Sequence, residues 1–519
     1  MHRSKPARSA RRLPAPTAPI KGLIPALIAA LIAALIPALG ASLLAGCAAL
    51  APPERADSPA AARPALELPA QWSQGPAAIV ATDATDGAAS RASRDWWQGF
   101  HDAPLLQLVD RALAHNLDLR SAAVTLQHAR ALRELAAATQ QPALGLSASA
   151  ARNRSGGGGG NSSSLRVGVD ASWEADLFGA QAAARTAAQA DVDSAAATLS
   201  ATRLAIAAET GLAYLQWQAA RAQQAAAASS LAKQRQTQAL VALRERTGLA
   251  GGLELEQARS AVLQLEARLA ALQHTQAQAQ HALALLTGTA PPRLAPGLDA
   301  ARTAPAERVA RAPALPALPQ PAALLQRRPD LQAAEHRIAS QLATLAQRQA
   351  ERRPSLRISG NLGLQAATLS ALGGSGALVA GLVAAIDWTL LDGGAGRARV
   401  DAQQAALDAA RLDWQAAVLA AARDVEDALS ALASARERET TLQRAARAAD
   451  EAARLARIGY ETGISDFLNL LDAERSASSA AEAWVSAQSE LAASHIRLYK
   501  ALGGGWSAGP APEARSTRP

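Results

Sequence analysis

The sequence repeats the order of its own landmarks, and this repetition limits the possible folds more than any other feature. Similar residues recur at a spacing of 212 or 215 positions. The matching pairs are Asn116-Leu117-Asp118-Leu119 with Arg328-Pro329-Asp330-Leu331, Pro142 with Pro354, Trp173 with Trp388, and Gly248 with Gly463. Four pairs in register predict an internal duplication, with one copy at 95–290 and the other at 321–503. The Pro-rich linker 291–320 between them cannot be helical throughout.

Each copy contains two runs of about ten residues in which apolar and polar side chains alternate. The apolar members are Leu144, Leu146 and Ala148, then Val167, Val169, Ala171 and Trp173, then Leu356, Ile358, Leu362 and Leu364, and finally Leu378, Leu382, Ile386 and Trp388. Alternation with period two predicts β-strands with one apolar and one polar face. A soluble sheet with one wet face is the simpler interpretation. The strand length favours a barrel wall with lipid outside and water inside.

The rest of each copy is free of proline and follows a heptad pattern. No Pro occurs in 143–290 or in 355–509. In the second copy the seam includes Leu407, Arg411, Trp414, Val418, Ala421, Val425, Ala428, Leu432 and Ala435. Alanine at many seam positions implies close helix approach, so several helices must pack side by side. The first helix of each pair, at about 179–246 or 394–459, is about 100 Å long and suits crossing a periplasm.

Four membrane strands cannot stand alone in a bilayer. An open four-stranded sheet would leave two unpaired edges, which lipid cannot hydrate. The barrel must therefore close between chains, which predicts a homo-oligomer whose coiled coils continue the barrel as a hollow cylinder. Such an assembly is a conduit rather than a reaction site.

The amino terminus has the parts of a secretory leader that ends at the only cysteine. Residues 1–46 combine a basic stretch with an apolar run, and Leu44-Ala45-Gly46-Cys47 matches the bacterial lipobox. Pro25 and Pro37 interrupt the apolar run, which argues against a spanning helix. We therefore predict a signal peptide at 1–46, diacylglycerol and an N-acyl lipid on Cys47, a tether at 47–94 and a tail at 504–519. With a single cysteine the fold has no disulfide.

Charge and composition remove other classes of function. The formal net charge is +8, but residues 1–46 contain six basic and no acidic residues, so the remainder carries only +2. No nucleic-acid partner is therefore predicted. Gly393-Gly394-Ala395-Gly396 lacks the ending of a phosphate-binding loop. The closest histidines on a helix, His274 and His281, have no carboxylate at ligand spacing. We predict no catalytic residue, no metal and no cofactor beyond the lipid.

Several motifs identify a family by resemblance. They are Trp97, Phe100, Asp102 and Leu105, then Trp173-Glu174-Ala175-Asp176-Leu177-Phe178-Gly179, Leu324-Leu325-Gln326-Arg327-Arg328-Pro329-Asp330-Leu331, Leu391-Asp392-Gly393-Gly394, Leu470-Leu471-Asp472-Ala473 and Leu498-Tyr499-Lys500-Ala501-Leu502-Gly503-Gly504-Gly505-Trp506. These stretches closely resemble the TolC-like outer membrane factor family, and the lipidated form is similar to its NodT-type branch of resistance-nodulation-division efflux systems. The resemblance covers roughly 95–506.

The resemblance implies a mainly α-helical protein with a transmembrane β-barrel. Three copies would complete a twelve-stranded barrel, and their antiparallel coiled coils would form a periplasmic α-barrel. The implied place is the outer membrane of a Gram-negative bacterium. The implied partners are outer membrane lipid, a periplasmic adaptor (membrane fusion) protein and an inner-membrane pump. The implied function is an exit duct for drugs or other small toxic compounds.

Site residues follow from the resemblance where positions match. The helix-turn-helix tips expected to face the adaptor contain Arg246, Thr247, Gly248, Tyr460, Thr462 and Gly463. Leu468 and Asp472, one helical turn apart, match the positions that form the closed periplasmic gate, where apolar and carboxylate rings can bar solutes and attract cations. The alternative is a solvated helix start in which Asp472 merely pairs with Arg475.

Two other functions stay open on the sequence. An outer membrane channel for type I protein secretion is the first, since selectivity would reside mainly in the inner-membrane pump. The second is a non-pore coiled-coil adaptor lipoprotein, which the four alternating strands disfavour because an adaptor would need a lipoyl-like or small β-barrel domain between its helical halves.

Overall fold

The computed structural model describes residues 69, 71–73, 96–153, 162–294 and 321–504. Cys47 and the leader lie outside these residues, as do most of the tether, positions 295–320 of the linker and nearly all of the tail. The predictions made for those segments therefore stay predictions.

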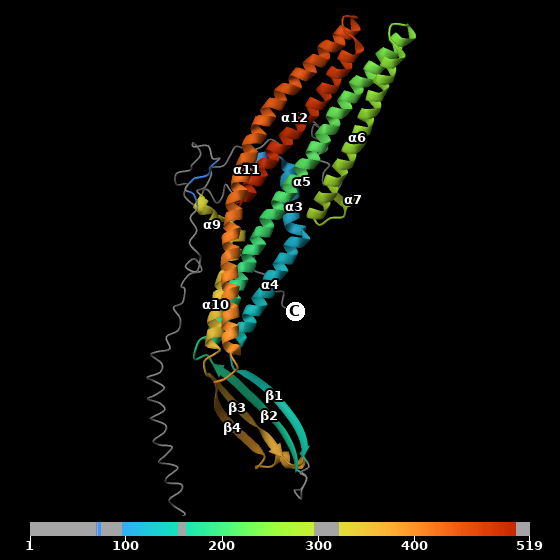
Figure 1. Cartoon of the computed structure of the whole chain (residues 1–519). Helices are drawn as coiled ribbons and strands as arrows, with labels where there is room; N and C mark the ends of the chain where they lie inside the picture. The colour runs from blue at the N-terminus through green and yellow to red at the C-terminus, as the bar shows by residue number, and fades with distance from the viewer. Residues whose placement is uncertain (1–68, 70, 74–95, 154–161, 295–320, 505–519) are drawn as a thin grey trace, which may run out of the picture. The chain divides into compact units, whose positions relative to one another are not determined.

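The described chain runs through the same succession of elements twice (Figure 1). The first succession is α3 (Ala103–His115), α4 (Leu117–Ala138), β1 (Ala143–Asn153), β2 (Ser162–Ala175), α5 (Ala180–Arg246) and α6 (Gly252–Leu286). The second is α9 (Leu324–Arg327), α10 (Pro329–Ala350), β3 (Ser355–Ala366), β4 (Leu378–Asp387), α11 (Ala395–Glu461) and α12 (Phe467–Ala501). Short helical turns complete the set: η3 (Trp96–Phe100), α7 (Pro291–Leu294), η5 (Pro321–Ala323) and η6 (Ser370–Gly373).

The longer helices of the two successions match in length as well as in order. α5 and α11 each have 67 residues, and α6 and α12 each have 35. Their bounds differ by 215 positions throughout, so any residue of the first hairpin has a counterpart 215 positions later. α4 and α10, of 22 residues each, differ by 212.

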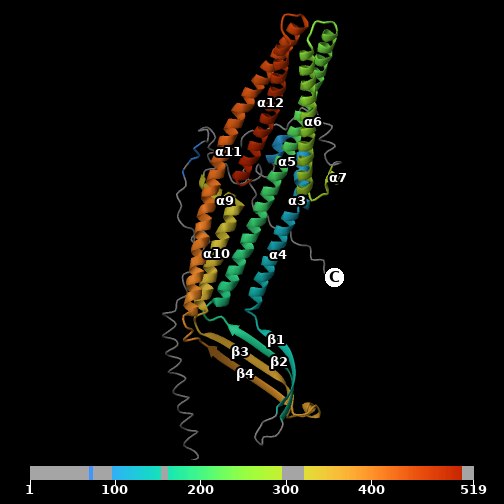
Figure 2. The ribbon, with the colours of Figure 1, turned by 45° about the vertical axis from the view of Figure 1, so that its right-hand side comes forward.

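The heptad seam is buried where the sequence places it. In α11 the side chains of Leu407, Trp414, Val418 and Ala421 are buried and pack with Leu331 and Ile338 of α10. Nearer the turn the seam of α11 is only half-buried. In each view of Figures 1 and 2 the α5/α6 and α11/α12 hairpins lie beside each other, and α5 contacts α12. No helix of the described residues is both long and apolar enough to cross a membrane.

Four antiparallel strands form one sheet in the order β1-β2-β3-β4. β2 and β3 join the two repeats, with Asp170 opposite Asn361 and Glu174 opposite Arg357. The apolar face is uncovered within the chain: Leu146 is 81% exposed and Leu382 80%. Large apolar side chains left in this state require a nonaqueous or protein neighbour.

Equivalent tryptophans bind two strand ends to the turns that follow α4 and α10. The indole Nε1 of Trp173 donates to the Gln140 carbonyl at 3.0 Å, and that of Trp388, which follows β4 directly, donates to the Arg352 carbonyl at 3.3 Å. The two tryptophans that the sequence pairs as landmarks therefore make equivalent hydrogen bonds.

Candidate functional site

Both long hairpins turn at a glycine whose conformation the sequence anticipates. Gly248 and Gly463 have φ angles of 75° and 77°, in the left-handed region that glycine adopts without strain. The amide of the following residue donates back to a carbonyl five residues earlier, Leu249 to Arg244 and Ile464 to Gly459, both at 2.8 Å. This is the Schellman pattern that ends a helix.

Most of the predicted tip residues lie at the surface. Arg246, Thr247, Gly248, Thr462 and Gly463 are all exposed. Tyr460 differs, because it lies in the last turn of α11 with only 4% of its surface exposed. Its contacts therefore lie inside the tip, and the predicted adaptor contact of Tyr460 stays a prediction.

Tyr460 joins the two tips. Its ring meets that of Phe467 edge to face at 5.8 Å, and the Arg244 guanidinium of α5 lies 4.3 Å from its centroid. Arg244 Nη2 also donates to the Glu461 carbonyl at 2.9 Å, and the Tyr460 hydroxyl donates to Glu254 Oε2 at 3.4 Å. Burial is the main reason that the pKa of Tyr460 is raised, so the hydroxyl remains a donor at neutral pH.

The predicted gate residues project from the first turns of α12. Leu468 is 58% exposed and Asp472 is also exposed, whereas Phe467, Leu470 and Leu471 pack inward against α5 and α6. Within the described residues no ion pair links Asp472 to Arg475, so the alternative of a self-contained pair is not what the structure contains.

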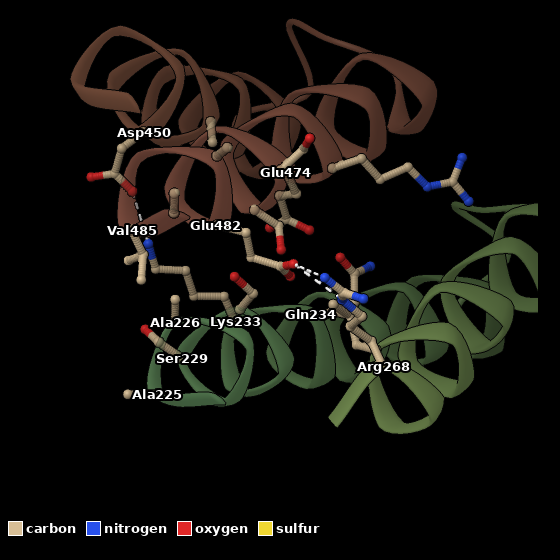
Figure 3. A pocket seen from close by; sticks show the side chains of 18 of the residues that line it. Ala225, Ala226, Ser229, Lys233, Gln234, Arg268, Asp450, Glu474, Glu482 and Val485 are labelled. Carbon is tan, nitrogen blue, oxygen red and sulfur yellow. Dashed lines mark hydrogen bonds and ion pairs between the residues drawn. The ribbon is translucent and has the colours of Figure 1, made fainter. Parts of the chain in front are cut away.

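Ion pairs, here called charged ties, lie farther from the tips than the predicted gate residues do, around a cavity of about 1070 Å³ between the two hairpins (Figure 3). Lys233 Nζ reaches Asp450 at 2.9 Å and Arg268 reaches Glu482 at 2.8 Å. Both pairs are drawn as dashed lines in the figure and both cross from one hairpin to the other. Exposed pairs of this kind contribute little stability each.

One of these charged ties is less exposed to solvent than the others. Arg457 Nη2 lies 2.7 Å from Glu474 Oε1, which also accepts from the Thr237 hydroxyl at 2.8 Å, and the Glu474 side chain is only 8% exposed. Glu474 Oε2 and Gln234 Nε2 have no hydrogen-bond partner in the described chain, and both residues line the cavity. Buried groups of this kind are usually satisfied by water.

Sequence reasoning missed these ties because helical period cannot say which polar seam positions meet across two hairpins. Tyr460 and Phe467 carried a usable signal, since aromatic residues make up only 3% of the chain and two of them flank one turn. The described residues contain no group of three or more His, Cys, Asp or Glu side chains able to hold a metal ion.

The described chain combines long paired helical hairpins with a four-stranded sheet whose apolar face and edges are uncovered. This combination defines the class of outer membrane conduits that several chains complete. The family model for the outer membrane efflux protein matches residues 108–289 and 321–504. The chain therefore belongs to the outer membrane efflux protein family.

Individual relatives agree over most of their length. Outer membrane protein OprJ of Pseudomonas aeruginosa is 30% identical over 84% of this chain and 92% of its own. Toluene efflux pump outer membrane protein TtgC of Pseudomonas putida is 31% identical over 90% and 94%. The solved structure of the outer-membrane channel OprN superposes with a TM-score of 0.73 at 32% identity, covering 83% of this chain and 98% of that one.

These similarities confirm the predicted family, the mainly α-helical fold with a β-barrel, and the location in the outer membrane of a Gram-negative bacterium. The chain is an outer membrane channel subunit of a tripartite efflux pump. Its partners are those predicted: two further copies, a periplasmic adaptor and an inner-membrane pump.

Proposed function

We propose that Leu468 and Asp472 form the periplasmic gate of this efflux duct and that the exposed tip residues contact the adaptor. The proposed gate rests on one observation, the contrast between exposed and buried side chains in the first turns of α12. Leu468 and Asp472 point away from the hairpin, while their neighbours Phe467, Leu470 and Leu471 anchor the helix. In a homotrimer three copies would supply an apolar ring and a carboxylate ring.

The adaptor contact rests on the exposure of the tip residues. Thr247 and Gly248 of one tip and Thr462 and Gly463 of the other are exposed, with Arg246 beside them. Tyr460 contributes indirectly, because it links the two tips through Arg244 and Phe467. Changes at Tyr460 should therefore act through tip geometry.

The transported substrate and the lipid anchor complete the proposal. We infer that the duct serves small toxic compounds, by analogy with the toluene pump component TtgC. The chain itself conducts and catalyses no reaction, and its only covalent group is the diacylglycerol and N-acyl lipid on Cys47. Mass spectrometry of the mature N-terminal peptide tests the anchor: a peptide without acyl chains refutes it.

Conductance in planar bilayers tests the gate. Asp472→Ala should alter single-channel conductance and its block by multivalent cations, because a ring of three carboxylates disappears. Gln257→Ala is the matched control, since Gln257 occupies the counterpart position in the first hairpin. If both variants behave like the wild type, in bilayers and in drug susceptibility of cells, Asp472 is not part of the gate.

A further inference from the structure

An ion pair lies along the polar face of the sheet. Arg166 Nη2 is 2.9 Å from Asp170 Oδ1, both on β2, and the Ser147 hydroxyl of β1 donates to Asp170 Oδ2 at 2.5 Å. Side chains alternate across a strand, so Arg166, Asp170 and position 168 between them share the polar face.

The spacing of this pair restricts the residue between its members. Residues four apart on a strand have Cα atoms about 13 Å apart, so Arg166 and Asp170 can meet only if the arginine lies along the strand over position 168. Position 168 is Gly168. Any side chain there would stand in the path of the guanidinium.

The backbone around Gly168 leaves no room for such a side chain in any case. Gly168 lies opposite Gly363 of β3. A Cβ added at Gly168 would lie 2.9 Å from the Leu362 carbonyl oxygen, and one added at Gly363 would lie 2.5 Å from that of Val167. Beside them the Asn361 amide lies over another glycine, Gly381, at 2.7 Å from where its Cβ would be. At this level the wall is therefore thin and its polar side chains lie flat.

Charges on the polar face of the described sheet nearly cancel. Its arginines are Arg166 and Arg357, and its carboxylates are Asp170, Glu174 and Asp387. Arg166 is paired with Asp170, and Arg357 lies 4.0 Å from Glu174. Asp387, at the end of β4 nearest α11, has no pair among the described residues.

We propose that the Arg166–Asp170 pair, held flat over Gly168, keeps the middle of the barrel wide and electrically neutral and thereby sets the charge selectivity of this section of the duct. The inference rests on the proposed duct, in which the polar face points into the lumen. In a homotrimer three pairs surround the passage. Breaking the pair on one side would leave a ring of three like charges in a narrow wet space.

Cysteine labelling from outside intact cells tests the proposal without opening the periplasmic gate. Ser172→Cys places a thiol on the polar face beyond Asp170 as seen from the β1–β2 loop. Its modification rate is measured with a cationic and an anionic methanethiosulfonate, and protein without the added cysteine gives the background. The ratio of the two rates reports the charge that a reagent meets at the Arg166–Asp170 level.

Opposite single substitutions should move this ratio in opposite directions. Arg166→Gln should raise the cationic-to-anionic ratio roughly three- to tenfold, and Asp170→Asn should lower it by a similar factor, as expected for three charges about 10 Å away in salt water. The double variant Arg166→Gln/Asp170→Asn should return to the parental ratio. Unchanged ratios in both single variants overturn the proposal. A cysteine that neither reagent modifies instead overturns the inward orientation of the polar face, and with it the proposed duct.

Discussion

The two helical hairpins have identical lengths but are stabilised differently at their tips. In α11/α12 the tip contains the edge-to-face pair Tyr460 and Phe467 and an N-cap, Asp466, whose carboxylate accepts from the Asn469 amide at 2.9 Å. In α5/α6 the counterparts are Glu245, Gly252 and Gly251, and no side chain caps α6. Two hairpins of the same backbone length therefore differ at their tips: the second has an aromatic pair and a side-chain cap, and the first has neither.

This difference coincides with the proposed gate. Leu468 and Asp472 follow the packed tip directly, whereas their counterparts in the first hairpin are Leu253 and Gln257. A gate must hold its side chains in fixed positions when closed, which requires anchored neighbours. The duplication supplied two hairpins of equal length, and only in the second do an aromatic pair and a side-chain cap lie next to these positions.

The largest expected difference between the hairpins concerns the buried tie. Glu474→Ala would remove the carboxylate partner of Arg457 in the cavity wall, at a cost of about 2 kcal/mol, since hydrogen bonds to charged groups contribute about 1.5–3 kcal/mol and Arg457 keeps its other acceptors. Arg259→Ala is the counterpart change. Its pair with Glu256 spans 3.8 Å and is well exposed, so about 0.5 kcal/mol or less is expected. Amide hydrogen exchange measures both changes, in α11 and α12 for Glu474→Ala and in α6 for Arg259→Ala.

A double variant separates charge from packing in this prediction. Arg457→Leu with Glu474→Leu removes both charges, so it should protect α11 and α12 better than Glu474→Ala alone. Equal exchange in Glu474→Ala and Arg259→Ala would mean that the buried tie contributes no more than a surface pair.

The second expected difference is a sensitivity to acid that arises from His495 in α12. Burial, followed by the nearby Arg436 guanidinium, lowers the pKa of His495 to about 4, and its side chain is 2% exposed. Because the unfolded chain binds the proton more readily, the stability associated with His495 is complete above about pH 6.5 and is lost as pH falls toward 4. At pH 5 the loss is about 2 kcal/mol.

The first hairpin supplies the control for this effect. Gln280 is the counterpart of His495 and does not titrate. His495→Gln should therefore flatten the fall in thermal stability between pH 7.5 and pH 5. A variant with the same pH profile as the wild type would assign the acid sensitivity to other groups.

Much of the fold could be predicted because its signals are local and repeated. The landmark pairs at 212 and 215 positions predicted two successions of elements in the same order, and the helix pairs α4/α10, α5/α11 and α6/α12 obey those offsets to the residue. Alternation in β2 and β3 predicted the strands and their faces. Gly248 and Gly463 predicted the turns, since a positive φ strongly favours glycine.

The contents of the site were less predictable because they depend on contacts between distant segments. Tyr460 was expected among the adaptor-facing tip residues, but Arg244, more than two hundred positions away, covers its ring. The tie between Thr237, Arg457 and Glu474 likewise unites three helices. Helical period places each residue on a face and leaves its partner undetermined.

The smallest expected difference concerns the two helix starts, and it can be tested in both directions. Asp466→Ala should cost about 1 kcal/mol at the start of α12, because the Asn469 amide loses its acceptor. Gly251→Asp should stabilise the start of α6 by up to about 1 kcal/mol, because Gly251 has an extended backbone and open space where a Cβ would lie. Exchange of the Asn469 amide and of its counterpart, that of Glu254, reports the two effects. If the packing of Phe467 and Tyr460 alone makes the second tip rigid, Asp466→Ala will leave the Asn469 amide as protected as before. Loss of that protection would instead show that the cap and the aromatic pair both hold the helix start from which Leu468 and Asp472 project.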